Sequence, residues 1–382
     1  MLFVLLLTAA NLRAPITAVG PVLDNIRHTF GLSAAAAGVI NFIPLLMFAL
    51  LSPVAALAGN RFGLERSLWN ALLLLTSGSV IRWLPDENAL WLGTLLLSAG
   101  IAAANVLLPP LIKRDFTGHS AKYIGLYAAT MSITASLASG IAVPLAEVSD
   151  AGWLLSLGVW AVPAFTALIV WLPLVRKKPD LPCRSGVIRT SGGTSPWCSV
   201  IGWQVSLFMG LQSLAFYTVI SWFTPYAQAQ GYTQADAGWL LFLYQAIAII
   251  ANLGCTAALK RMRDARLTAF IASAAIFIGL LGLLLWPQQA ALWLIIAGLG
   301  AGASLVLSLS LFNLRASDHH QASKLSGMAQ CVGYALAASG PLFFGVLHEH
   351  SGSWTLPLIV LVTLSLLQTL LAPLAGSAKQ ID

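Results

Sequence analysis

The stretch Phe-Gly-Leu-Ser-Ala-Ala-Ala-Ala-Gly at residues 30–38 is echoed two hundred residues later by Gln-Gly-Tyr-Thr-Gln-Ala-Asp-Ala-Gly at 230–238. The same register, within two residues, continues along the chain through these pairs: Arg66 with Arg266, Pro85 with Pro287, Trp91 with Trp293, Arg114 with Arg315 and Trp153 with Trp354. A long-period repeat in a very apolar chain indicates two copies of one membrane bundle. Such an architecture is typical of carriers.

The composition supports a membrane protein. The chain is 58% hydrophobic and 9% charged, against about 25% charged residues in a soluble domain. We place twelve apolar runs long enough to cross a bilayer near 2–23, 36–58, 67–84, 89–112, 123–146, 152–174, 201–228, 236–258, 267–286, 290–313, 325–347 and 353–374. Because a lipid-embedded backbone must satisfy its own hydrogen bonds, we predict an all-α membrane protein with twelve transmembrane helices.

The placement of positive charge predicts the orientation. Of the twenty Lys and Arg, only Arg27 and Arg82 fall in the loops of one side, and Arg13 falls inside a span. The other basic residues fall on the opposite side, which the positive-inside rule places in the cytoplasm together with both termini. Because the basic residues follow the membrane topology, binding of nucleic acid is the weaker interpretation of the net charge.

The longest loop divides the chain. Residues 175–200 are basic and rich in Ser, Gly and Pro, and they separate six spans from six. We therefore predict an N-terminal six-helix half at 1–174, a cytoplasmic linker at 175–200 and a C-terminal six-helix half at 201–382. Since each half has an even number of spans, the halves run parallel and are related by an axis along the membrane normal.

Targeting signals and cysteines add two expectations. Apolar character continues past Ala18 with no basic segment before it, so we expect an uncleaved first span, and a short cytoplasmic lead upstream of this start is left open. The cysteines form no close pair, so we expect neither a disulfide nor a zinc site. They are Cys183, Cys198, Cys255 and Cys331.

Arg13 is the most informative single residue. It lies near the middle of the first span, where a charge costs at least about 2.5–3.5 kcal/mol on insertion scales. One interpretation is a structural arginine bonded to backbone carbonyls. We favour the other, in which Arg13 binds a solute with negative or partial negative charge. Thr17 at i+4 and Asp24 at i+11 fall on the same face of a straight helix.

No Asp or Glu falls at mid-membrane, although proton-driven carriers usually hold a buried carboxylate. The chain is therefore a facilitator, or protonation occurs on the substrate or at a mouth residue, for which Asp24 is the candidate.

His348-Glu349-His350 lacks metal-ligand spacing, and the sequence has no P-loop and no Gly-x-Ser-x-Gly elbow. We expect no metal, no cofactor and no enzyme activity.

Residues 55–67, Ala-Ala-Leu-Ala-Gly-Asn-Arg-Phe-Gly-Leu-Glu-Arg-Ser, resemble the gating-loop motif of the major facilitator superfamily. In that motif Gly, Asp-Arg, Gly and basic residues follow in order. Arg61, Gly63 and Arg66 fit, whereas Asn60 stands where Asp is usual, which puts a charge latch through that Asp in doubt. The resemblance implies two parallel six-helix halves working by alternating access.

A narrower similarity, to the cyanate / 2-nitroimidazole permease family of bacteria, covers almost the whole chain and is closer to the 2-nitroimidazole exporter branch. It is carried by Asn-Leu-Arg-Ala at 11–14, Gly-Pro-Val-Leu-Asp-Asn-Ile-Arg at 20–27, Arg-Phe-Gly-Leu-Glu-Arg-Ser-Leu at 61–68, Asn-Val-Leu-Leu-Pro-Pro-Leu-Ile-Lys-Arg-Asp-Phe at 105–116 and Leu-Ser-Gly-Met-Ala-Gln-Cys-Val-Gly-Tyr at 325–334. The similarity implies an inner-membrane carrier of a small anionic or nitrogenous solute, such as 2-nitroimidazole or cyanate. We expect it to act as a monomer.

The superfamily architecture also implies which residues line the pocket, because the first helix of each three-helix unit faces the central cavity. The implied substrate-binding residues are Asn11, Arg13, Thr17, Asn105, Gln212, Phe216, Tyr217, Ser308 and Asn313, with Tyr127 and Gln330 as secondary candidates. Ser213 stands at the repeat position of Arg13, so only the N-terminal half contributes a positive charge to the implied set.

Two other functions compete with this one. A broad-specificity drug-efflux proton antiporter fits the repeat, but it would prefer a buried acid. A non-transporting membrane sensor is disfavoured because no soluble domain is appended.

Overall fold

The computed structural model describes the chain except for residues 33, 117, 149–151, 176–194, 260–263 and 382. The expectation for Cys183 and most of the predicted linker therefore lie outside the described residues. The chain divides into two compact units. The first comprises Met1–Asp115 with Leu126–Gly193, and the second comprises Phe116–Gly125 with Thr194–Asp382.

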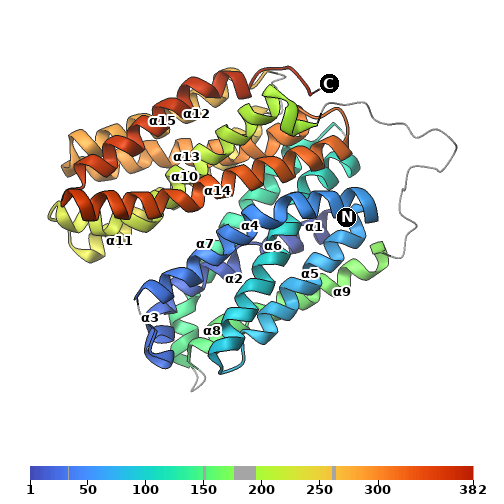
Figure 1. Cartoon of the computed structure of the whole chain (residues 1–382), viewed down its shortest axis with the longest axis horizontal. Helices are drawn as coiled ribbons and strands as arrows, with labels where there is room; N and C mark the ends of the chain where they lie inside the picture. Colours follow the sequence, from blue (N-terminus) through green and yellow to red (C-terminus); the bar gives the residue numbers. More distant parts are fainter. Residues whose placement is uncertain (33, 117, 149–151, 176–194, 260–263, 382) are drawn as a thin grey trace. The chain divides into compact units, whose positions relative to one another are not determined.

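The helices up to residue 175 (Figure 1) include five segments that are long and apolar enough to cross a membrane, and the 18-residue helix Leu64–Ile81 is the remaining predicted span. These helices are α1 (Leu2–Ala10), α2 (Ala14–Thr17), α3 (Val19–Phe30), α4 (Ala34–Phe62), α5 (Leu64–Ile81), α6 (Glu87–Asp115), α7 (Ser120–Val148), α8 (Trp153–Gly158) and α9 (Ala161–Val175). Within the first unit α5 packs along both α6 and α9, and α4 packs along α6.

The helices after the linker make the other six spans. They are α10 (Val200–Ala229), α11 (Gln234–Leu259), α12 (Arg266–Leu285), α13 (Ala290–Leu314), α14 (His319–Ser351) and α15 (Thr355–Ala375), with short 3₁₀ turns η1 (Pro196–Cys198) and η2 (Pro287–Gln289). In the second unit α10 packs along α14, and α12 packs along α13 and α15. The predicted all-α fold with twelve membrane-crossing segments is confirmed.

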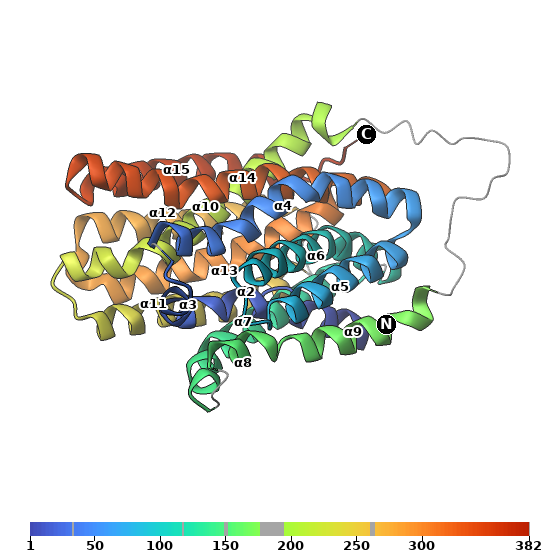
Figure 2. The ribbon, with the colours of Figure 1, turned by 60° about the horizontal axis from the view of Figure 1, so that its bottom comes forward.

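Two of the predicted spans are present but are not continuous helices. The first span consists of α1, α2 and α3. The sixth consists of α8 followed by α9, both labelled in Figure 2. Pro15 and Pro163 lie at these breaks, and each lacks the N–H that a helix needs at that position. The repeat positions carry Ala215 and Leu364, and the corresponding helices α10 and α15 are unbroken.

Glycines show that the repeat extends to packing. An added Cβ at Gly78 of α5 would lie 2.3 Å from backbone of α6, and one at Gly279 of α12 would lie 2.6 Å from backbone of α13. The next such pair, Gly100 and Gly300, would each place a Cβ 2.4 Å from backbone of the partner helix. Small residues at these positions allow the third and fourth helices of each half to approach closely.

The surface of the described helices is rich in large apolar side chains. Leu57, Trp239 and Phe343 are 66%, 71% and 67% exposed. Such exposure would be unfavourable in water over a wide area and suits a protein whose outer faces contact lipid.

Arg82, which the charge count places in a loop of the less basic side, is buried. It follows directly on α5, and its side chain is only 1% exposed.

Candidate functional site

The break in the first span creates the local structure around Arg13. Without an N–H, Pro15 cannot donate to the carbonyl of Asn11, and its ring clashes with that carbonyl. The N–H groups of Asn11 and Leu12 instead make tight turns onto Thr8 and Ala9, with distances of 3.0 and 3.1 Å. Arg13 is therefore the N-cap of the four-residue helix α2, at φ −127° and ψ −35°.

Arg13 and Thr17 stay together across this short helix. The N–H groups of Ile16 and Thr17 both donate to the Arg13 carbonyl at 3.0 Å. The Thr17 hydroxyl donates to the Arg13 carbonyl at 3.2 Å and to the Ala135 carbonyl of α7 at 3.1 Å. Ser139 of α7 donates to the Thr17 carbonyl at 3.2 Å. The partly buried Arg13 side chain thus projects from a turn that is tied to α7.

Asn11 lies in the packing between the first and sixth spans. Its side chain is fully buried, and Nδ2 donates to the Leu7 carbonyl at 2.8 Å and to the Pro163 carbonyl at 3.3 Å. Trp171 of α9 supports the same contact by donating to the Thr8 hydroxyl at 2.8 Å. The amide therefore joins the two proline-broken spans, whatever further role it has toward a solute.

Asn105 and Tyr127 are brought into direct contact. The Tyr127 hydroxyl donates to Asn105 Oδ1 at 2.8 Å, linking α7 to α6. Tyr127 is 1% exposed and Asn105 is 6% exposed. The secondary candidate from the sequence is thus the hydrogen-bond partner of a primary one.

The candidates on α10 form a small polar and aromatic group in the second unit. Gln212 Nε2 donates to the Ser213 hydroxyl at 2.7 Å. The Phe216 ring meets Tyr217 edge-on, with centroids 5.5 Å apart, and lies 5.9 Å from the ring of Tyr244 on α11. Tyr244 was not among the predicted site residues, although its position inside an apolar run was visible in the sequence.

The remaining candidates of the second unit are buried. Ser308 donates to the Ser304 carbonyl at 2.8 Å within α13, and Gln330 donates to the Ser326 hydroxyl at 2.9 Å within α14. Asn313 is 5% exposed near the end of α13. These contacts are local to their own helices, and they hold neutral polar groups in an apolar interior at small cost.

Asp24 lies on α3, and its side chain is outside the described part of the structure. Its assignment to the face of Arg13 assumed one straight helix. The turns at residues 11–13 and at Ala18 separate α3 from α1 and α2, so helical spacing no longer relates Asp24 to Arg13.

The predicted gating loop is a single residue long. Gly63 joins α4 to α5 at φ 92° and ψ 151°, a conformation that residues with a side chain rarely adopt. Asn60 and Arg61 lie in the last turn of α4, where Cζ of the exposed Arg61 is 5.4 Å from the centroid of the Phe62 ring. Arg66 is exposed in the first turn of α5.

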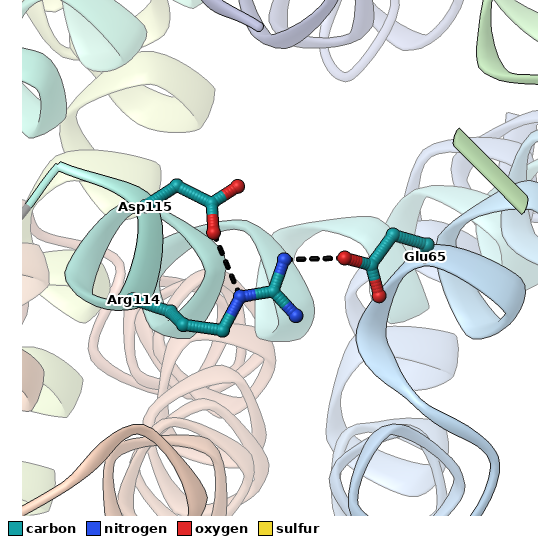
Figure 3. A network of polar contacts seen from close by, with 3 residues as sticks. All are labelled: Glu65, Arg114 and Asp115. Atoms are coloured by element: carbon teal, nitrogen blue, oxygen red, sulfur yellow. Dashed lines mark hydrogen bonds and ion pairs between the residues drawn. The ribbon is translucent and has the colours of Figure 1, made fainter. Parts of the chain in front are cut away.

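An ion pair next to this loop was missed from the sequence. The Arg114 guanidinium at the end of α6 binds the Glu65 carboxylate at the start of α5, and its Nε donates to Asp115 at 2.7 Å (Figure 3). Helical periodicity cannot reveal a pair 49 residues apart. The second half has no such pair, because Ala265 stands at the repeat position of Glu65. Arg315, at the repeat position of Arg114, is buried and bonds backbone carbonyls instead.

Comparison with known proteins relates this arrangement to a large family. The family model described as the Major Facilitator Superfamily matches residues 2–338. The chain is 40% identical to the 2-nitroimidazole transporter of Escherichia coli (strain K12) over 378 residues, which cover 99% of this chain and 95% of that protein. It is 28% identical to the cyanate transport protein CynX of the same strain over 383 residues, covering 98% and 97%.

A solved structure shows the same fold. The proton:xylose symporter XylE, bound to 6-bromo-6-deoxy-D-glucose, matches with a TM-score of 0.79 at 14% identity, covering 100% of this chain and 96% of that one. At this identity the likeness concerns the fold and not the solute.

Proposed function

The chain belongs to the major facilitator superfamily, and from this premise we propose that it carries a small anionic or nitrogenous solute, such as 2-nitroimidazole or cyanate, by alternating access. Membership makes it a multi-pass membrane protein and a secondary transporter with a small-molecule substrate, and not an enzyme. The family predicted from the sequence motifs is confirmed. The drug-efflux alternative is not favoured, because the relatives are named for 2-nitroimidazole and cyanate.

The observation that supports this substrate class is the guanidinium of Arg13 at the break in the first span. A guanidinium presents its N–H donors in a planar fork that matches the paired oxygens of a nitro or carboxylate group. Arg13 is the one formal charge among the candidate binding residues, and Ser213 stands at its repeat position. A single small anion or planar nitro compound suits this asymmetry.

Neutral groups complete the proposed site. Thr17 lies on the same short helix as Arg13, and the Asn105 amide is held in one orientation by Tyr127. Neutral amides and hydroxyls select by hydrogen-bond geometry, at a smaller desolvation cost than a second charge. The proposed contribution of the C-terminal half comes from Gln212, Phe216, Tyr217, Ser308, Asn313 and Gln330.

If transport is coupled to protons, we propose Asp24, an acid at the mouth just beyond the apolar run 2–23, as the coupling residue. Uptake by Asp24→Asn vesicles should lose its dependence on an imposed pH gradient and keep passive exchange. Gradient-driven uptake at the wild-type rate in this variant would remove Asp24 from the mechanism.

The membrane arrangement is proposed from the distribution of charge. The N-terminal half at 1–174 and the C-terminal half at 201–382 would run parallel, joined by a cytoplasmic linker at 175–200. We propose that the chain lies in the bacterial inner membrane with both termini in the cytoplasm. It would act as a monomer, with lipid and solute as its partners and without nucleic acid.

Reconstitution tests the proposed function. Vesicles containing the full chain should exchange labelled 2-nitroimidazole or labelled cyanate faster than protein-free vesicles, and the same solute should raise the melting temperature of the purified protein. A chain that transports neither solute and is stabilised by neither would contradict the proposal.

A further inference from the structure

Arg82 is a buried charge whose side chain bonds a backbone carbonyl beside the proposed substrate site. Its side chain is 1% exposed, and Nη2 donates to the carbonyl of Pro15 at 2.8 Å. Its Nε atom is buried without a hydrogen-bond partner among the described residues. Burying a guanidinium is unfavourable, and among the described residues the hydrogen bond to the Pro15 carbonyl is what offsets this cost and holds the side chain in place.

The backbone of Arg82 is fixed by close helix packing. Gly93 of α6 faces Arg82, and a Cβ at Gly93 would lie 2.8 Å from the Arg82 nitrogen and 2.9 Å from its Cβ. The absence of a side chain at Gly93 therefore lets the end of α5 approach α6. The close packing of α5 on α6 thus determines where the Arg82 backbone lies, and from that position its side chain reaches the Pro15 carbonyl of α2.

The helix that Arg82 contacts depends on its neighbours for its position. α2 has four residues, with a turn before it at residues 11–13 and another after it at Ala18. So short a helix is not stable through its own hydrogen bonds. Its described side-chain anchors come from Arg82, bound to the Pro15 carbonyl, and from α7, bound to Thr17.

We propose that Arg82 is a positioning residue for the substrate site: its guanidinium, bound to the Pro15 carbonyl, holds α2 so that Arg13 presents its fork to the solute. This inference rests on the proposed function, in which Arg13 binds the solute. Pro15 lies two residues after Arg13, and the turn between them closes on the Arg13 carbonyl. A displacement of Pro15 therefore reaches Arg13 directly.

A purely structural arginine would behave differently, and Arg315 provides the matched control. Arg315 is also 1% exposed and also bonds backbone carbonyls, those of Ala375 at 3.2 Å and Gly376 at 2.7 Å. These carbonyls end α15 in the second unit. Substitution of either arginine should lower the melting temperature, but only Arg82 should change solute affinity.

The test uses the purified full chain with 2-nitroimidazole and cyanate as probes. Arg82→Lys should weaken binding of the recognised probe by roughly tenfold, the loss expected for one charged hydrogen bond, while Arg315→Lys leaves the Kd within about twofold. Arg82→Gln should weaken binding further. If that variant does not fold, the comparison of Arg82→Lys with Arg315→Lys decides the question.

A double substitution separates positioning from packing. If Arg82 acts by orienting the fork of Arg13, its effect should largely vanish in an Arg13→Lys background, since an ammonium has no fork to orient. Equal, additive losses in the two backgrounds would overturn the inference. So would equal losses of affinity in the Arg82→Lys and Arg315→Lys variants.

The outcomes also distinguish this inference from the proposed function. Wild-type affinity in Arg82→Lys, together with lost binding in Arg13→Ala, would overturn the inference and leave the proposed function standing. Wild-type affinity in Arg13→Ala, or a wild-type chain that binds neither probe, would overturn both.

Discussion

The hydroxyl of Tyr127 donates a 2.8 Å hydrogen bond to the Oδ1 atom of Asn105. Both side chains are buried, so each satisfies a polar group of the other that would otherwise be costly in an apolar interior. The bond also fixes the orientation of the amide. A tyrosine that sequence reasoning ranked second thus controls the geometry of a residue that it ranked first.

Tyr127→Phe should therefore affect both stability and affinity. Loss of the bond should lower the free energy of unfolding by about 0.5–1.5 kcal/mol and raise the Kd for 2-nitroimidazole. Tyr226→Phe is the control, because it removes a 2.5 Å bond to the Leu283 carbonyl in the second unit. The control should be destabilised without a change in Kd. An unchanged Kd in Tyr127→Phe would remove the pair from solute binding.

Pro15→Ala should make the first span a continuous helix across its present break. An alanine supplies the missing N–H for the Asn11 carbonyl, as Ala215 does at the repeat position in the unbroken α10. The melting temperature should hold or rise while binding of 2-nitroimidazole weakens, because Arg13 leaves its place at the turn. Pro225→Ala is the control, since Pro225 lies inside an unbroken helix. Wild-type affinity in Pro15→Ala would show that the break does not serve binding.

Glu65→Gln should weaken the contact between the start of α5 and the end of α6. The Glu65 and Arg114 side chains are 21% and 20% exposed, so the expected loss of unfolding free energy is modest, about 1 kcal/mol or less. The matched control is Asp264→Asn, whose 3.6 Å pair with Arg266 is more than half exposed. A thermal shift in the control equal to that in Glu65→Gln would show that surface charge alone is responsible.

Cysteine labelling tests the proposed topology. In a background without the native cysteines, Ser185→Cys and Ser351→Cys should react oppositely with an impermeant maleimide added outside intact spheroplasts. Labelling at position 351 alone is expected, because the linker is proposed to face the cytoplasm. Labelling at position 185 alone would reverse the orientation.

The sequence predicts the fold well because its signals are local or periodic. Apolar length predicts twelve spans, and the repeat of Arg66 and Trp153 predicts two copies of one bundle. The breaks could also have been predicted, since the repeat positions of Pro15 and Pro163 are occupied by Ala215 and Leu364, which are not prolines. Prolines are common in membrane helices, however, and most of those in this chain do not interrupt one.

The site is less predictable, because its contacts join helices far apart in the sequence. The charge count places Arg82 in a loop, at the end of the run 67–84, whereas its side chain is buried and bonds the Pro15 carbonyl. The bond from Asn11 to Pro163 and the pair of Glu65 with Arg114 likewise depend on packing that no spacing rule encodes. Charge and hydropathy locate Arg13, but only the three-dimensional structure shows what holds it.

The most direct test of the account is the affinity of Arg13 variants for the solute. Arg13→Lys keeps the charge and loses the planar fork, so it should bind 2-nitroimidazole more weakly than wild type and fold normally. Arg13→Ala should lose solute-induced thermal stabilisation while its own melting temperature holds, because a charge that is costly in the membrane interior has been removed. Wild-type solute-induced stabilisation in Arg13→Ala would contradict the account.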